Sequence, residues 1–259
     1  MIGELLRKQR ALIVAGAVSF AAFLVLGVVA LVDATPIMGV NRWLKPMKFT
    51  LSPAIYIWTL AFFLYLLKGR ERAKKIIAYG VILLMAGEIG LVIMQAARGT
   101  TSHFNIAKPF DALVFATMGV LILINTLLIV YLLILYFQAE IDAPLSILWG
   151  LRLGLILFLL ASAVGGLMSA WLRHSIGVAD GGAGLPFVNW STRGGDLRAA
   201  HFVGMHALQA LPLFALALER YAKQYAAGAT IAFALAYLGL FAFILAQALA
   251  GQPLLAMFH

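Results

Sequence analysis

The dominant feature of this sequence is a series of long apolar runs separated by short polar segments. A helix needs about 20 mostly apolar residues to cross roughly 30 Å of hydrocarbon, and several segments meet this requirement. We expect helices and not a β-barrel, because backbone polar groups in lipid must be satisfied internally and the runs do not alternate. The seven predicted spans are residues 11–32, 47–67, 75–97, 109–137, 145–171, 198–218 and 226–250.

The composition agrees with a membrane protein. Hydrophobic residues make up 64% of the 259 residues and charged residues 11%, whereas a soluble domain is about half apolar and a quarter charged. The longest predicted loop, 172–197, is too short for a core of its own, but its glycines and Pro186 indicate a structured outer loop. We therefore predict an all-α integral membrane protein, a seven-transmembrane-helix bundle that forms one membrane domain over residues 1–259.

Basic residues in the short loops predict the orientation. The strongest cluster, residues 68–75, is expected in the cytoplasm together with the N-terminus, and the C-terminus at His259 is expected outside. Because the basic residues flank apolar runs, the net charge of +9 indicates a lipid bilayer as the partner and no nucleic acid. The predicted location is the inner or plasma membrane.

Eight basic residues nevertheless fall on the predicted outer side, where the positive-inside rule disfavours them. Either these residues have a task at that surface, which we favour, or the predicted orientation is wrong. They are Arg42, Lys45, Lys48, Arg98, Lys108, Arg173, Arg193 and Arg198.

Ionisable groups inside the predicted spans indicate a pocket, since such groups usually face a bundle interior or a water-filled cavity. Glu88 and His206 both lie about nine residues from the outer ends of their spans, or roughly 13 Å at helical rise. We expect them to face each other. The predicted ligand-binding and proton-coupling residues are Lys48, Tyr56, Glu88, Gln95, His206 and Gln209.

A second set of polar residues is expected at the outer mouth of this pocket. Asp196 follows two glycines and is also a plausible N-cap, while Asp111 could complement a positive helix N-terminus. Trp43 is expected to be an interfacial anchor. The mouth residues are Arg42, Lys45, Arg98, His103, Asp111, Asp196, Arg198 and His201.

No catalytic or metal-binding motif is present. The sequence has no Walker loop, no HExxH and no GxSxG, and it lacks cysteine. His201 and His206 are about 140° apart on a helix, which is a poor arrangement for chelating one metal ion. We therefore assign no catalytic residue and no metal ligand, and we leave open whether the protein is an enzyme.

Three functions fit these features. The first is a protein with an outward-facing polar pocket that binds or transports a small ligand, with an anion as one option, and has Glu/His proton coupling. The second is a membrane redox module that binds haem b or a quinone, with His206 or His201 as a ligand. The third is a non-catalytic structural or assembly subunit whose polar face contacts a partner membrane subunit.

Overall fold

The computed structural model describes residues 2–181 and 184–255. Seven of its helices are long and apolar enough to cross a membrane, as the apolar runs predict. The bounds also agree, the largest difference being the third span, which starts at Glu71 instead of residue 75. The predicted placement of His259, and residues 182–183 of the long loop, lie outside the described residues.

The chain forms two compact units, residues 1–140 and 141–259, and each is described by itself. The single membrane domain therefore stays a prediction. Unit 1 contains α1 (Ile2–Lys8), α2 (Arg10–Val32), β1 (Pro36–Ile37), β2 (Val40–Asn41), α3 (Leu44–Leu66), α4 (Glu71–Ala97) and α5 (Pro109–Gln138). Unit 2 contains α6 (Leu145–Trp171), β3 (Ser175–Ile176), β4 (Gly195–Asp196), α7 (Leu197–Tyr221), the 3-10 turn η1 (Lys223–Tyr225) and α8 (Ala226–Leu249).

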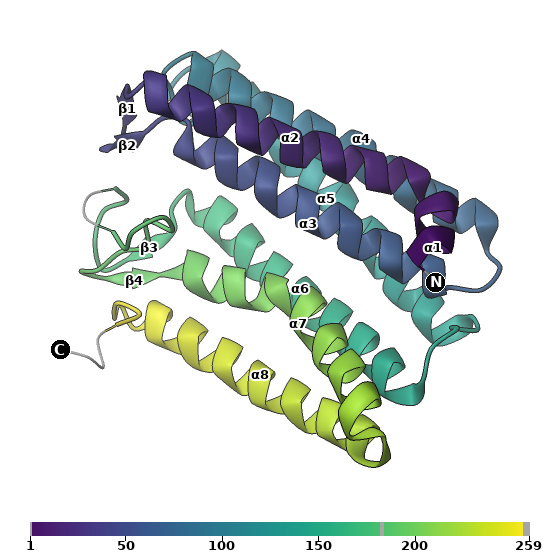
Figure 1. The fold of residues 1–259 in the computed structure, drawn as a ribbon. Helices are drawn as coiled ribbons and strands as arrows, with labels where there is room; N and C mark the ends of the chain where they lie inside the picture. The colour runs from purple at the N-terminus through teal and green to yellow at the C-terminus, as the bar shows by residue number, and fades with distance from the viewer. Residues whose placement is uncertain (1, 182–183, 256–259) are drawn as a thin grey trace. The chain divides into compact units, whose positions relative to one another are not determined.

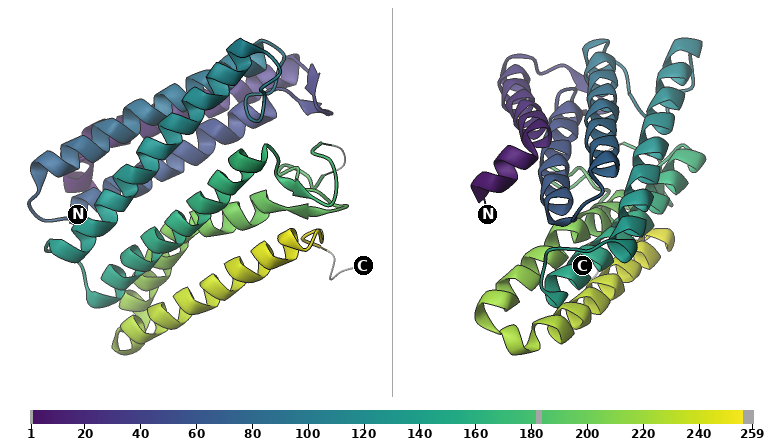
Figure 2. Two further views of the ribbon diagram at one scale, coloured as in Figure 1. Left: turned by 180° about the vertical axis from the view of Figure 1, so that it is seen from behind. Right: turned by 90° about the vertical axis from the view of Figure 1, so that its right-hand side faces the viewer.

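The four long helices of unit 1 lie side by side and alternate in direction (Figures 1 and 2). At one end, the Arg42 guanidinium in the segment after α2 lies 3.5 Å from the carbonyl oxygen of Ala97, where α4 ends. At the other end, the Lys68 ammonium lies 2.6 Å from a Glu140 carboxylate oxygen, and the Lys68 amide donates to the Glu140 carbonyl. The loops of unit 1 therefore form two groups, one at each end of the helices.

Small residues allow close packing of α2 on α3. A Cβ atom at Gly16 would collide with the indole ring of Trp58, whose Nε1 donates to the carbonyl oxygen of Ile13. One turn further along, the Ser19 hydroxyl donates to the Thr50 carbonyl at 2.7 Å. The bond satisfies a polar side chain within an otherwise apolar interface, as is usual for buried polar groups.

Unit 2 has its tightest helix contact between α6 and α7. A Cβ atom at Gly150 would lie 3.0 Å from the carbonyl oxygen of Leu211, and one at Gly154 would lie 3.0 Å from that of Ala207. These are backbone atoms, which cannot rotate away as a side chain can. Glycine at both positions therefore sets the short distance between the two helices, as small residues do in membrane bundles.

The long segment between α6 and α7 is folded back on itself. Strands β3 and β4 pair antiparallel, with Ser175 opposite Asp196, and Gly184 and Ser191 form a further antiparallel bridge. The amide of Leu197, the first residue of α7, donates to the carbonyl of His174. The segment is thereby attached to the start of α7.

Candidate functional site

The residues of the predicted pocket divide between the two units. Unit 1 holds Tyr56 and Glu88, and unit 2 holds His206. The expected pairing of Glu88 with His206 would join the units, and it stays a prediction. The site is described below within each unit.

Glu88 is the most unusual side chain of unit 1. It lies in α4 with 2% of its surface exposed, and neither carboxylate oxygen has a hydrogen-bond partner among the described residues. An ionisable group lies close to it: His103 Nε2 is 3.9 Å from Glu88 Oε1. Since this is longer than a hydrogen bond, the carboxyl group remains unsatisfied, which is costly for a buried polar group.

His103 reaches Glu88 from the loop between α4 and α5. Aromatic rings hold the imidazole: its centroid is 5.3 Å from that of Phe49 and 6.3 Å from that of Phe115. Nδ1 lies 3.2 Å from the Ser102 hydroxyl, and a quarter of the side chain is exposed. Burial, together with the charge of Lys45, holds the pKa of His103 well below its ordinary value. The imidazole is therefore neutral at neutral pH.

Lys45 supplies positive charge at this site. It lies in the first turn of α3 with its ammonium 5.6 Å from the centroid of the Phe49 ring. It is close enough for its charge to act on both Glu88 and His103. Lys48, one turn later on α3, is half-buried. The structure thus brings together a carboxyl group, an imidazole and an ammonium group from α4, the α4–α5 loop and α3.

Deeper in unit 1, the predicted pocket residue Tyr56 has a specific partner. Its hydroxyl donates to the side-chain oxygen of Asn125 at 3.1 Å, and both residues are buried. The bond links α3 to α5. A buried amide and phenol in contact can hydrogen-bond a ligand or simply fix the two helices.

Gln95, Arg98 and Asp111 form a closed network near the same end of unit 1. Asp111, 4% exposed, accepts a hydrogen bond from Gln95 Nε2 at 3.0 Å and from the Arg98 guanidinium at 2.6 Å, and Arg98 also donates to the Gln95 amide oxygen. Every member therefore has a partner within the unit. This network joins α4 to α5, and within it the positive charge of Arg98 is paired with the carboxylate of Asp111.

Arg42 also forms an ion pair within unit 1, with a carboxylate that the sequence analysis did not identify. It pairs with Asp33, which directly follows α2, and the Trp43 indole donates to Asp33 at 2.8 Å. Hydrogen bonds from Thr35, Trp43 and Arg42 hold the pKa of Asp33 far below its ordinary value. Trp43 is 9% exposed and packs against α2 and α4, so it contributes to the packing of unit 1, and its role as an interfacial anchor stays a prediction.

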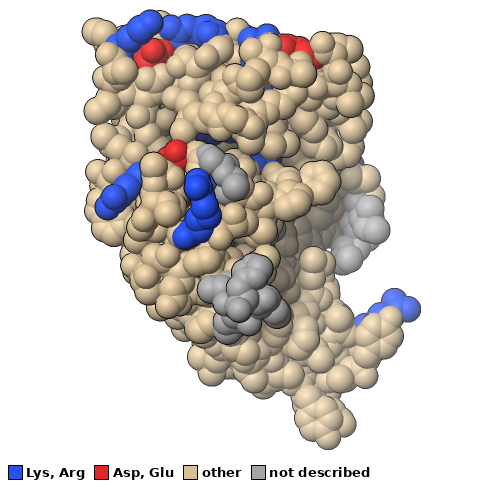
Figure 3. Space-filling model, turned by 90° about the vertical axis from the view of Figure 1, so that its left-hand side faces the viewer, with Lys and Arg blue, Asp and Glu red and all other residues tan. Residues whose placement is uncertain are grey.

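Figure 3 views the chain from the β1–β2 end of unit 1. Along the upper edge, Lys and Arg side chains lie beside carboxylates. Unit 1 contains the ion pairs Arg42–Asp33 and Arg98–Asp111. The basic residues predicted at this surface are thus partly neutralised by neighbours in their own unit.

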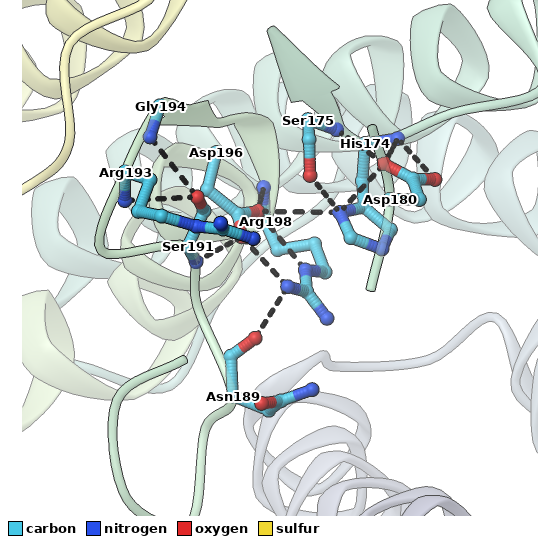
Figure 4. A network of polar contacts seen from close by, with 9 residues as sticks. All are labelled: His174, Ser175, Asp180, Asn189, Ser191, Arg193, Gly194, Asp196 and Arg198. Carbon is cyan, nitrogen blue, oxygen red and sulfur yellow. Dashed lines mark hydrogen bonds and ion pairs between the residues drawn. The ribbon is translucent and has the colours of Figure 1, made fainter. Parts of the chain in front are cut away.

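In unit 2, Asp196 and Arg198 bind each other (Figure 4). Asp196 caps α7 by accepting from the Arg198 amide at 3.0 Å, as predicted for an N-cap. The Arg198 guanidinium returns to the same carboxylate at 2.6 Å and also donates to the carbonyl of Asn189. His174 Nδ1 lies 3.4 Å from Asp180 and 3.8 Å from Asp196. This cluster fastens the long loop to the start of α7.

The two histidines of α7 have backbone partners. His201 Nδ1 lies 2.7 Å from the carbonyl oxygen of Ala161 on α6, and His206 Nδ1 lies 2.8 Å from that of Phe202. Since a carbonyl only accepts, each Nδ1 carries a hydrogen in this contact. The His206 ring also packs on Phe202, with centroids 4.0 Å apart. Gln209, one turn beyond His206 on α7, is half-buried.

No group of three or more His, Cys, Asp or Glu side chains within the described part of the chain is arranged to hold a metal ion. No protein-family model matches the chain, and comparisons with curated proteins and with solved structures found no match.

Proposed function

We propose that this multi-pass membrane protein binds or transports a small anionic ligand and couples ligand binding to protonation of Glu88. The observation that carries this proposal is the buried Glu88 carboxyl group, which has no hydrogen-bond partner among the described residues and lies beside His103. Ionisable groups inside membrane spans commonly mark ion pathways and proton relays. A purely structural glutamate would be expected to have a hydrogen-bond partner.

Lys45 provides the coupling between proton and anion. When Glu88 is ionised, its negative charge offsets the positive charge of Lys45 and repels a second anion. When Glu88 is protonated, the ammonium attracts the ligand without that competition. Proton binding and anion binding therefore favour each other, and the linkage is reciprocal. Lys45 is assigned this role because its charge acts on both Glu88 and His103.

His103 offers a route for the proton. A quarter of the His103 side chain is exposed, and its Nε2 lies 3.9 Å from Glu88 Oε1. A neutral imidazole accepts a proton at one nitrogen and releases one from the other. In this proposal His103 passes protons between the loop surface and the buried carboxyl group. In this proposal the N-terminus faces the cytoplasm of a cell that has the protein in its inner or plasma membrane.

The test measures thermal unfolding of the detergent-purified protein with acetate, phosphate and sulfate as probes between pH 5 and 8. We expect at least one probe to raise the Tm more at low pH than at high pH. Glu88→Gln should remove the pH dependence, and Lys45→Gln should remove the response. Lys108→Gln, an exposed lysine, is the matched control and should behave as the wild type.

His206→Ala tests the contribution of unit 2 in the same assay. Loss of the response in a correctly folded His206→Ala variant would make His206 a contributor to ligand binding. If no probe changes the Tm of the wild type at any pH, anion coupling is wrong, and a structural role for Glu88 gains support.

Binding of haem b is a second candidate, favoured by one observation. Both His201 and His206 hold Nδ1–H on a backbone carbonyl, which is the usual way to orient an axial histidine that binds iron through Nε2. An absorbance scan of protein purified from its native membrane distinguishes the two functions. A Soret band that His206→Ala abolishes would support haem; an absorbance spectrum without one would contradict it.

A further inference from the structure

A hollow of about 610 Å³ opens at the η1 end of unit 2. Its walls come from α6, α7, η1 and α8, and include Ser146, Glu219, Lys223, Tyr225 and Gly228. Small-molecule sites are typically about 300–1,000 Å³, so this volume can take a ligand. A second hollow over residues 221–225 shares Lys223 and Tyr225 with it. Neither belongs to the Glu88 site, which lies in unit 1.

Opposite charges line this hollow. Glu219 is held in place by Ser146, a residue with 1% exposure that donates its hydroxyl hydrogen to the carboxylate. Lys223 follows after α7 has ended at Tyr221 and is exposed. The described structure contains no ion pair between Glu219 and Lys223. The hollow therefore offers one fixed acceptor for a cation and one flexible partner for an anion.

Helices that cross a membrane end near the lipid head groups, and the hollow lies at such helix ends. Three helices long enough to cross a membrane start or end around it, namely α6, α7 and α8. Tyr221 and Tyr225 are 80% and 67% exposed, and exposed tyrosines are typical of the membrane–water interface. This placement holds whichever side of the membrane the end faces.

We propose that this hollow binds a phospholipid head group that carries both a primary ammonium group and a phosphate, the chemistry of phosphatidylethanolamine. The ammonium group donates to Glu219 and the phosphate is bound by Lys223. A quaternary ammonium has no N–H to donate to the carboxylate, and an anionic glycerol head group would be repelled by it. At Gly228 a Cβ atom would have no heavy atom within 4 Å, which leaves room for the head group.

The experiment is native mass spectrometry of the full-length, delipidated protein titrated with phosphatidylethanolamine, phosphatidylcholine or phosphatidylglycerol of identical acyl chains. We expect phosphatidylethanolamine to bind roughly tenfold more tightly than the other two, the scale of one charge-assisted hydrogen bond. Glu219→Gln should remove this preference, and Lys223→Gln should weaken phosphatidylethanolamine and phosphatidylcholine alike. Glycerophosphoethanolamine has the same head group but no acyl chains, so it distinguishes the free head group from the intact lipid as the ligand. If it competes with the lipid, the head group alone is sufficient for binding. If the lipid binds and it does not compete, the site is specific for membrane lipid.

Gly228→Phe fills the hollow and should abolish the preference. Gly239→Phe is the matched control, because Gly239 lies on the same helix and a Cβ atom there also meets no heavy atom within 4 Å. Equal binding of all three lipids, or an unchanged preference in folded Gly228→Phe, would overturn the proposal. These results are independent of the anion assay at Glu88.

Discussion

The Glu88 carboxyl group lies 3.9 Å from the imidazole of His103 and has no hydrogen-bond partner among the described residues. Burial of an unsatisfied polar group costs about 1–3 kcal/mol. Glu88→Leu should therefore raise the free energy of unfolding by about that amount, while it removes the pH dependence of any anion response. The measurement is chemical unfolding in detergent. Loss of stability in Glu88→Leu would instead identify the carboxyl group as a structural element.

His103 should make stability depend on pH. Its pKa in the folded protein is well below 6.5, chiefly because of burial, so below about pH 6.5 the unfolded chain binds a proton that the folded chain does not. The His103 contribution is therefore complete above that pH and falls as the pH is lowered through it. Tm values from pH 8 to pH 5 should show this decrease, and His103→Phe should make it smaller. An equal decrease in the variant would assign it to other groups.

The α6–α7 contact should not tolerate even one methyl group at Gly154. Its Cβ atom would be 3.0 Å from a backbone oxygen, so Gly154→Ala should cost about 1–3 kcal/mol of stability. Gly166→Ala is the control on the same helix, because no heavy atom lies within 4 Å of that Cβ position. It should be neutral or slightly stabilising, as alanine favours helices. Similar effects of both variants on unfolding would contradict the packing argument.

Asp196 combines a helix cap with an ion pair, and two variants separate these roles. Asp196→Asn keeps a capping side chain but loses the charge that binds Arg198. Asp196→Ala loses both, with a cost of about 0.5–2 kcal/mol for the cap alone. We expect limited proteolysis between residues 172 and 195 to be slow in the wild type, faster in Asp196→Asn and fastest in Asp196→Ala. Equal cleavage rates in all three would show that the cluster does not fasten the loop.

Much of the helical architecture was predictable because each element carries a local signal. An apolar run of sufficient length must form a helix in lipid, and Pro109 and Asp196 mark two helix starts in the sequence. The division into two units had no such signal. It depends on which helices pack tightly, and contacts such as Gly16 with Trp58 join positions 42 residues apart that no periodicity connects.

The candidate site was predictable only in part. Glu88 is conspicuous because a carboxyl group in an apolar run is costly wherever it lies. Its contact with His103 was not predictable, because His103 belongs to a loop whose path depends on packing against Phe49 and Phe115. Asp33 was missed for a similar reason: its partners Arg42 and Trp43 are brought to it by the β1–β2 turn.

The bond between Lys68 and Glu140 has a consequence for how the polypeptide can be divided. Unit 1 ends at Glu140, which is anchored to the turn after α3, and α6 does not begin until Leu145. A cut in the connector 141–144 would sever no helix and would leave each fragment with all of its own secondary structure. The two halves are thus candidates for separate synthesis and reconstitution, in which each fragment inserts into the bilayer by itself.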